Sequence, residues 1–190
     1  TSFGSLPANS RLSMAGGSRI SGATGVTLVT GGAATLATLL AANGNIAVTA
    51  GGAIGVLANE QLTASAGGAS LNGASLAMTA GSQVAALLDI DVVTTGDAFA
   101  TTLASTRGHV SVNAGGNAAV TTASIADAVL GDIIYRVTGN LAVGTAAAAG
   151  KIQANAGGSF TENAGGQLTS RTDLIAVTAD SVAMGAGAGM

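Results

Sequence analysis

Residues 44–52 read GNIAVTAGG, a short run of alternating apolar and small polar residues that closes on two glycines. Related phrases occur at residues 74–82 (ASLAMTAGS), 108–116 (GHVSVNAGG) and 150–158 (GKIQANAGG). Alternation with a period of two is typical of a β-strand with one face turned inward. The glycines supply the backbone freedom for a corner. A strand followed by a corner, repeated from end to end, predicts a parallel β-solenoid.

The spacing of these phrases indicates the size of one coil. The second branched or long residue of each copy serves as a marker, and the markers are Val29, Val48, Met78, Val112, Val143 and Val177. Weaker copies fill some of the longer intervals, so we expect one coil to take roughly 15 to 20 residues, with loops inserted elsewhere. The chain should then form about eight to ten coils. The fold expected is all-β: a parallel β-helix in a single elongated domain.

The phrases also suggest where this domain lies in the chain. Residues 16–183 carry the repeats, residues 1–15 form an irregular lead-in that contains Pro7, and residues 184–190 form a tail rich in Gly and Ala. A solenoid exposes strand edges at both ends unless they are covered. Neither terminal segment resembles a cap, so we expect the chain to continue in a parent protein or to stack on neighbours.

Two kinds of segment leave room for another local structure. The Ala-rich residues 35–42 and 145–149 are compatible with a turn or two of helix, but isolated helices this short are marginal in water. We therefore expect strand or loop in both places. Residues 129–137 are the least repetitive part and read as two strands around a Gly131-Asp132 turn.

Composition narrows the class of protein. The 190 residues include 30 Gly and no Cys, and only 8% are charged, against about 25% in an average soluble domain. Few aromatic residues are present, so the core must be thin and built from Ala, Val, Leu and Ile. A mean hydropathy of +0.56 and a net charge of −3 argue against disorder. No apolar run reaches the roughly 18 residues of a membrane span.

The charges also argue against two classes of partner or activity. Six basic residues are scattered along an acidic chain, which does not favour a nucleic-acid partner. Polysaccharide-cleaving β-helices concentrate acidic and basic residues in one groove, whereas the carboxylates here are dispersed; examples are Asp127, Asp132, Asp173 and Asp180. No Gly-x-Ser-x-Gly nucleophile motif is present. We expect no enzymatic activity and no cofactor.

A few residues remain as candidate sites. Asp89 and Asp91 fall on one face of a predicted strand and are weak candidates for calcium ligands, although a solvated outer face is the simpler interpretation. His109 is the only histidine and should face outward, and without cysteines it cannot build a structural zinc site. Asparagines before Ala-Gly pairs should stack as amide ladders inside corners; they are Asn113, Asn155 and Asn163.

The phrases resemble the repeat region of filamentous-haemagglutinin-type exoproteins, bacterial adhesins exported by two-partner secretion. The matching positions are residues 46–52, 76–81, 110–116 and 152–158. The resemblance implies that the parallel β-helix is right-handed and acts as a non-catalytic structural shaft in an adhesin of the bacterial cell surface or biofilm matrix. Its partners would be a host or bacterial surface glycan or protein, or copies of itself. The alternative function is a self-assembling extracellular filament, sheath or surface-layer subunit that stacks end to end.

Overall fold

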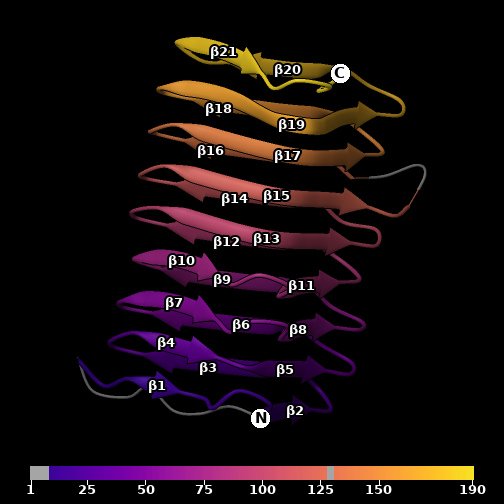
Figure 1. Ribbon diagram of the computed structural model, residues 1–190. Helices are drawn as coiled ribbons and strands as arrows, with labels where there is room; N and C mark the ends of the chain where they lie inside the picture. The colour runs from indigo at the N-terminus through magenta and orange to yellow at the C-terminus, as the bar shows by residue number, and fades with distance from the viewer. Residues whose placement is uncertain (1–8, 128–130) are drawn as a thin grey trace.

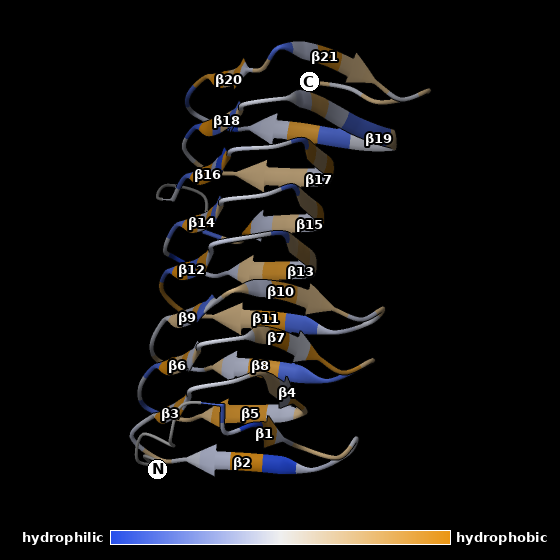
Figure 2. Ribbon diagram, turned by 90° about the vertical axis from the view of Figure 1, so that its left-hand side faces the viewer, coloured by the Kyte–Doolittle hydropathy of each residue, from blue (hydrophilic) through white to orange (hydrophobic). Residues whose placement is uncertain are grey.

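A computed structural model describes residues 9–127 and 131–190 of the chain. These residues form twenty-one β-strands and no helix. All the strand pairs are parallel and follow one another up a single elongated stack (Figure 1; Figure 2). The sheet that passes once through every coil contains eight strands, so the stack has eight rungs. The predicted parallel β-solenoid is confirmed.

The strands belong to two sheets. Sheet A contains β3 (Val26–Thr30), β6 (Ile46–Ala50), β9 (Ala69–Gly73), β12 (Ile90–Thr94), β14 (Val110–Ala114), β16 (Ile133–Val137), β18 (Ile152–Ala156) and β20 (Ile175–Thr178). One flank of sheet B starts with β1 (Leu12–Ser13), β4 (Ala34–Leu36), β7 (Ala53–Val56) and β10 (Ser75–Met78), and the other with β2 (Arg19–Gly22), β5 (Thr38–Ala41), β8 (Gln61–Ala64) and β11 (Gln83–Ala86). The later members are β13 (Ala98–Ser105), β15 (Ala118–Ile125), β17 (Leu141–Ala148), β19 (Ser159–Ser170) and β21 (Ser181–Met184).

The strands of sheet B become longer halfway along the stack. In the lower coils a turn separates its two flanks, as between β10 and β11, where Gly81 has a positive φ of 77°. From β13 onward the turn disappears and one long strand covers both flanks, because β13 pairs with β10 through Leu76 and with β11 through Val84. Each coil therefore has three sides, one from sheet A and two from sheet B.

The register of sheet A gives the true coil length. The residues that stack at its first inner position are Val26, Ile46, Ala69, Ile90, Val110, Ile133, Ile152 and Ile175. Neighbours in this series are 19 to 23 residues apart, slightly more than the expected 15 to 20. The sequence markers were not equivalent positions: Val48 and Val112 lie in sheet A, whereas Met78 and Val143 lie in sheet B. All three sides of the coil use the same alternation, so the phrase alone does not distinguish them.

The core consists of columns that run along the stack. The middle inner position of sheet A is occupied in turn by Leu28, Val48, Leu71, Val92, Val112, Tyr135, Ala154 and Val177. The first seven of these residues are at most 2% exposed. Burial of one Val or Leu side chain contributes about 1.5–3 kcal/mol. Because the rungs above and below provide that burial, stacking itself creates the core.

The structure also resolves the local alternatives. Residues 35–42 contribute to β4 and β5, and residues 145–149 belong largely to β17, so the strand interpretation was right. Strand β16 starts at Ile133, while residues 129 and 130 of the proposed paired segment lie outside the described residues, as does Pro7. In the expected lead-in, β1 already pairs with β4, and in the expected tail Met184 is the last residue of β21.

Candidate functional site

Polar side chains at one corner of the coil bind the backbone of the next rung. This corner lies where sheet A leads into sheet B. Asp97 Oδ1 accepts the backbone N–H of Asn117 at 2.7 Å, and Asn117 Oδ1 accepts that of Asn140 at 2.9 Å. Asn140 Oδ1 in turn accepts the N–H of Ser159 at 2.9 Å. We call these four residues the first corner ladder.

A second corner ladder runs along the edge where sheet B returns to sheet A. Asp89 Oδ1 accepts the N–H of His109 at 2.8 Å, and His109 Nδ1 accepts the N–H of Asp132 at 2.9 Å. Asp132 Oδ1 then accepts the N–H of Lys151 at 3.0 Å. Because Nδ1 accepts a hydrogen bond, neutral His109 carries its hydrogen on Nε2. His109 faces outward as expected, and its ring performs the same structural task as the carboxylates.

Glycine makes room for these ladders. A Cβ added to Gly139 would meet Asn117 Oδ1, and one added to Gly158 would meet Asn140 Oδ1, both well inside van der Waals contact. Gly108 lies in the same way over Asp89 Oδ1. None of these three glycines has a positive φ. Their role is therefore close approach between rungs, rather than the unusual backbone conformation that the sequence suggested.

A short motif in the sequence marks the ladders. Gly, a polar residue and an apolar residue follow one another at 96–98 (GDA), 116–118 (GNA), 139–141 (GNL) and 158–160 (GSF). The second ladder repeats the motif at residues 108–110, 131–133 and 150–152. The apolar residue begins the inner alternation of the following strand. This signal was available to sequence analysis and was missed.

The asparagine ladders predicted from Ala-Gly pairs were wrong. Asn113, Asn155 and Asn163 lie within strands β14, β18 and β19, not inside corners. Asn113 and Asn155 project from the outer face of sheet A, where Arg136 pairs in register with both. The alternation that buries Val112 and Ala154 necessarily turns the next residue outward.

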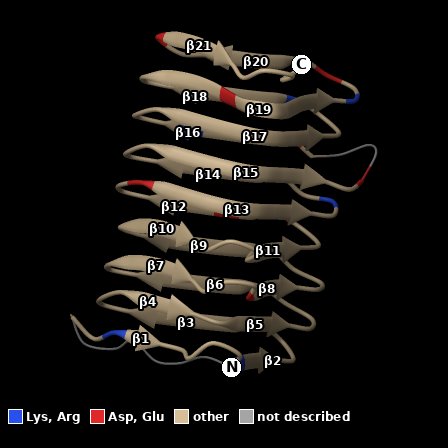
Figure 3. Ribbon diagram, viewed as in Figure 1, with Lys and Arg blue, Asp and Glu red and all other residues tan. Residues whose placement is uncertain are grey.

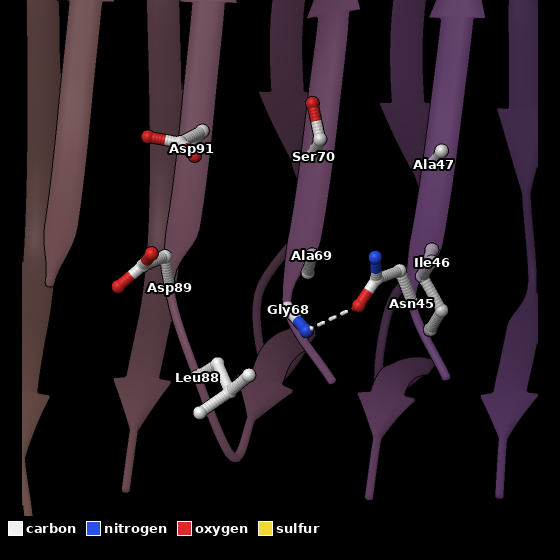
Figure 4. A pocket seen from close by; sticks show the side chains of 9 residues that line it. All are labelled: Asn45, Ile46, Ala47, Gly68, Ala69, Ser70, Leu88, Asp89 and Asp91. Atoms are coloured by element: carbon white, nitrogen blue, oxygen red, sulfur yellow. Dashed lines mark hydrogen bonds between the residues drawn. The ribbon is translucent and has the colours of Figure 1, made fainter. Parts of the chain in front are cut away.

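Asp89 and Asp91, the calcium candidates, line one shallow pocket at the edge of sheet A (Figure 4). Figure 4 shows both carboxylates on the same side, with Ser70 on the neighbouring rung in register with Asp91. Partial desolvation and the negative charge of Asp89 raise the pKa of Asp91, and nearby His109 offsets part of that rise. One oxygen of Asp89 is already engaged by the His109 N–H.

The pocket offers few ligands for a metal ion. Calcium takes six to eight oxygen ligands, and residues 9–127 and 131–190 contain no group of three or more His, Cys, Asp or Glu side chains suited to a metal. Calcium binding at Asp89 and Asp91 stays a prediction, for which the thermal midpoint with and without a chelator is the measurement.

The other carboxylates do not gather into one groove. Asp127 lies 3.9 Å from Arg107, and Asp132 lies 4.0 Å from Lys151, both at loop positions open to solvent, where ion pairs contribute little. Asp173 precedes β20, and Asp180 lies at the opposite corner between β20 and β21. Figure 3 shows the charged residues mainly at the loop edges of the stack, with the broad strand faces largely uncharged.

Three polar side chains lie inside the stack or between its rungs. Glu60 is buried and accepts the Thr38 hydroxyl and the Gly17 N–H, both at 2.6 Å. These two bonds hold the pKa of Glu60 below its ordinary value. Glu162 and the Tyr135 hydroxyl are fully buried and have no hydrogen-bond partner among the described residues. Burial raises the pKa of Tyr135. Sequence analysis singled out none of the three.

Comparison with known protein families, with curated proteins and with solved structures finds no match for this chain. Within the described part of the chain, no helix is long and apolar enough to cross a membrane.

Proposed function

We propose that this chain is a non-catalytic structural shaft of a bacterial cell-surface or biofilm-matrix adhesin. The observation that carries the proposal is the regular repetition of sheet A and of the corner hydrogen bonds from coil to coil. Sheet A stacks in register over eight rungs, and the two corner ladders, from Asp89 to Lys151 and from Asp97 to Ser159, repeat the same kind of rung-to-rung hydrogen bond. A chain built in this way gains length and stiffness with each added coil.

Two further features support this role. Continuous backbone hydrogen bonding leaves few irregular segments for proteases to cleave. The Gly-Gly phrases resemble filamentous-haemagglutinin-type repeats, and this resemblance supports an exported protein that works outside the cell. In that setting the partner is a surface glycan or protein of a host or a bacterium.

Removal of one complete coil tests the shaft. Deletion of residues 91–110 joins Ile90 to Ser111, and since Ile90 and Val110 occupy the same register position, every remaining column stays aligned. We expect the variant to fold and to shorten by about 4.8 Å, one rung, as measured by circular dichroism and small-angle scattering. Deletion of residues 91–100 removes half a coil and should prevent folding.

The same proteins test for catalysis. Wild type and the one-coil deletion are incubated with a panel of polysaccharides, and the release of reducing ends is measured. Cleavage by the wild type that the deletion abolishes would contradict the proposal, because a non-catalytic shaft contains no coil with a reactive site.

A second candidate function is end-to-end self-assembly, and one observation favours it. The last rung exposes 54% of Val182 and 47% of Met184, whereas their register partners Phe160 and Glu162 are fully buried. Within residues 9–127 and 131–190, strands β20 and β21 each pair with one neighbour only. A further coil from another copy would cover these side chains and continue both sheets.

A further inference from the structure

The outer face of sheet A carries a row of polar side chains centred on Arg136. Arg136 lies in β16, and its register partners on the adjacent rungs are Asn113 and Asn155. Thr178 follows Asn155 on the next rung. Neighbouring rungs are about 4.8 Å apart, so three hydrogen-bonding side chains lie within reach of one small group. All four residues line one shallow depression of the surface.

The side chains of Arg136, Asn113 and Asn155 form no polar contacts within the described part of the chain. At the first corner, the side-chain oxygens of Asn117 and Asn140 each accept a backbone N–H of the next rung. Within the described part of the chain, by contrast, the side chains of Arg136, Asn113 and Asn155 have no hydrogen bond and no ion pair. Their N–H groups face solvent, and an arginine between two amides presents several donors and a positive charge to one site.

Arg136 supplies a positive charge at this position. Arg136 is the one basic residue in the eight strands of sheet A, and Asp91, two rungs away in β12, is the one acidic residue. Arg107 and Lys151, elsewhere on the stack, already lie beside carboxylates. The planar guanidinium fork matches the two oxygens of a carboxylate, and amide N–H groups bind the hydroxyls that flank it in a sugar.

We propose that Arg136, Asn113 and Asn155 bind the carboxylate of an acidic polysaccharide, such as a uronic-acid chain. The ligand class rests on the proposed surface role, because an adhesin shaft meets such polymers outside the cell. An extended glycan would lie along the stack, with one uronate carboxylate on Arg136 and neighbouring hydroxyls on the two asparagines.

The test is binding of oligogalacturonate to the full chain, with neutral dextran and dextran sulfate fragments as comparisons. We expect saturable binding of oligogalacturonate and none of dextran. Substitution R136Q should weaken binding by roughly tenfold to a hundredfold, the range for loss of a charged hydrogen-bonding group. R136K should also weaken it, because lysine keeps the charge but lacks the fork. R19Q, which removes the same charge from an exposed site in β2, should leave binding unchanged.

Several results would overturn the inference. These are no saturable binding of oligogalacturonate, an equal effect of R136Q and R19Q, or binding of dextran sulfate alone. The inference and the shaft proposal fail separately. If oligogalacturonate does not bind while the one-coil deletion folds, only the ligand is wrong. If binding persists while the one-coil deletion unfolds, the shaft is wrong.

Discussion

Glu162 is a carboxylate residue buried at an apolar position of the core. It lies at an inner position of sheet B, between Val143 on the rung below and Met184 on the rung above. Its side chain is fully buried, and neither carboxylate oxygen has a partner among the described residues. An unpaired polar group in such a place costs free energy, while an apolar side chain of the same length would extend the column.

We therefore predict that Glu162→Met raises the free energy of unfolding by about 1–3 kcal/mol, measured by chemical denaturation. Glu60→Met is the matched contrast. Glu60 is also buried, but it accepts hydrogen bonds from Thr38 and Gly17, so its replacement should destabilise the protein. A destabilising Glu162→Met would show that the carboxylate has a partner of its own.

Glu60 also predicts a dependence on pH. Its pKa is lowered in the folded protein by the Thr38 and Gly17 hydrogen bonds. Stabilisation by its charged form is therefore complete above the ordinary pKa of a glutamate, and it is lost as the pH falls through the lowered value. In Glu60→Gln this acid-dependent loss of stability should disappear. Asp91 is present in both proteins, so the difference between their free energies of unfolding across acidic pH isolates the contribution of Glu60. Parallel curves for wild type and variant would contradict the assignment.

At the scale of an element, each corner is a coupled pair of residues on successive rungs. At the carboxylate and amide positions of the ladders, a side-chain oxygen accepts the N–H of the next rung, and the glycine of that rung leaves space for it. Asn140 and Gly158 form such a pair, since a Cβ on Gly158 would collide with Asn140 Oδ1. The two residues are 18 positions apart in the sequence, so their dependence on each other follows only from the stacking.

Asn140→Ala should lower the free energy of unfolding by about 0.5–1.5 kcal/mol, the usual contribution of one hydrogen bond. Gly158→Ala should destabilise as well, because it displaces the Asn140 amide. Asn155→Ala is the control: this asparagine projects from sheet A and has no side-chain hydrogen bond in the described structure. If all three variants unfold at the same denaturant concentration, the ladder does not stabilise the corner.

At the scale of the whole molecule, the stack differs between its interior and its last rung. Interior rungs are covered on both sides, whereas Leu174, Val182 and Met184 on the last rung are large apolar residues open to solvent. Exposed apolar groups beside an unpaired strand edge favour association with a further strand.

We predict that the chain associates in a concentration-dependent way and that Val182→Lys with Met184→Lys shifts it toward the monomer in sedimentation experiments. Leu88→Lys with Val93→Lys is the matched control, because these residues are exposed to a similar degree away from the last rung. Assembly that survives the first pair, or that the control pair disrupts equally, would argue against stacking through this end.

The sequence alone determined that the chain forms a solenoid. Alternation within phrases such as residues 46–50 requires strands with one buried face, and regular glycine corners require those strands to follow one another. Few aromatic and charged residues then dictate a narrow core. The alternation and the glycine corner are local properties, and both can be recognised within one phrase such as residues 44–52.

Tertiary structure decided which phrases are equivalent and what each outward residue meets. Val48 stacks on Leu71 rather than on Met78, because the three sides of a coil share one pattern and only the register separates them. Asn140 forms a rung-to-rung bond while Asn155 flanks Arg136, although both are asparagines near glycine. The physical reason is distance: the partner of each residue lies about twenty positions away in the chain, and coiling alone brings the two together.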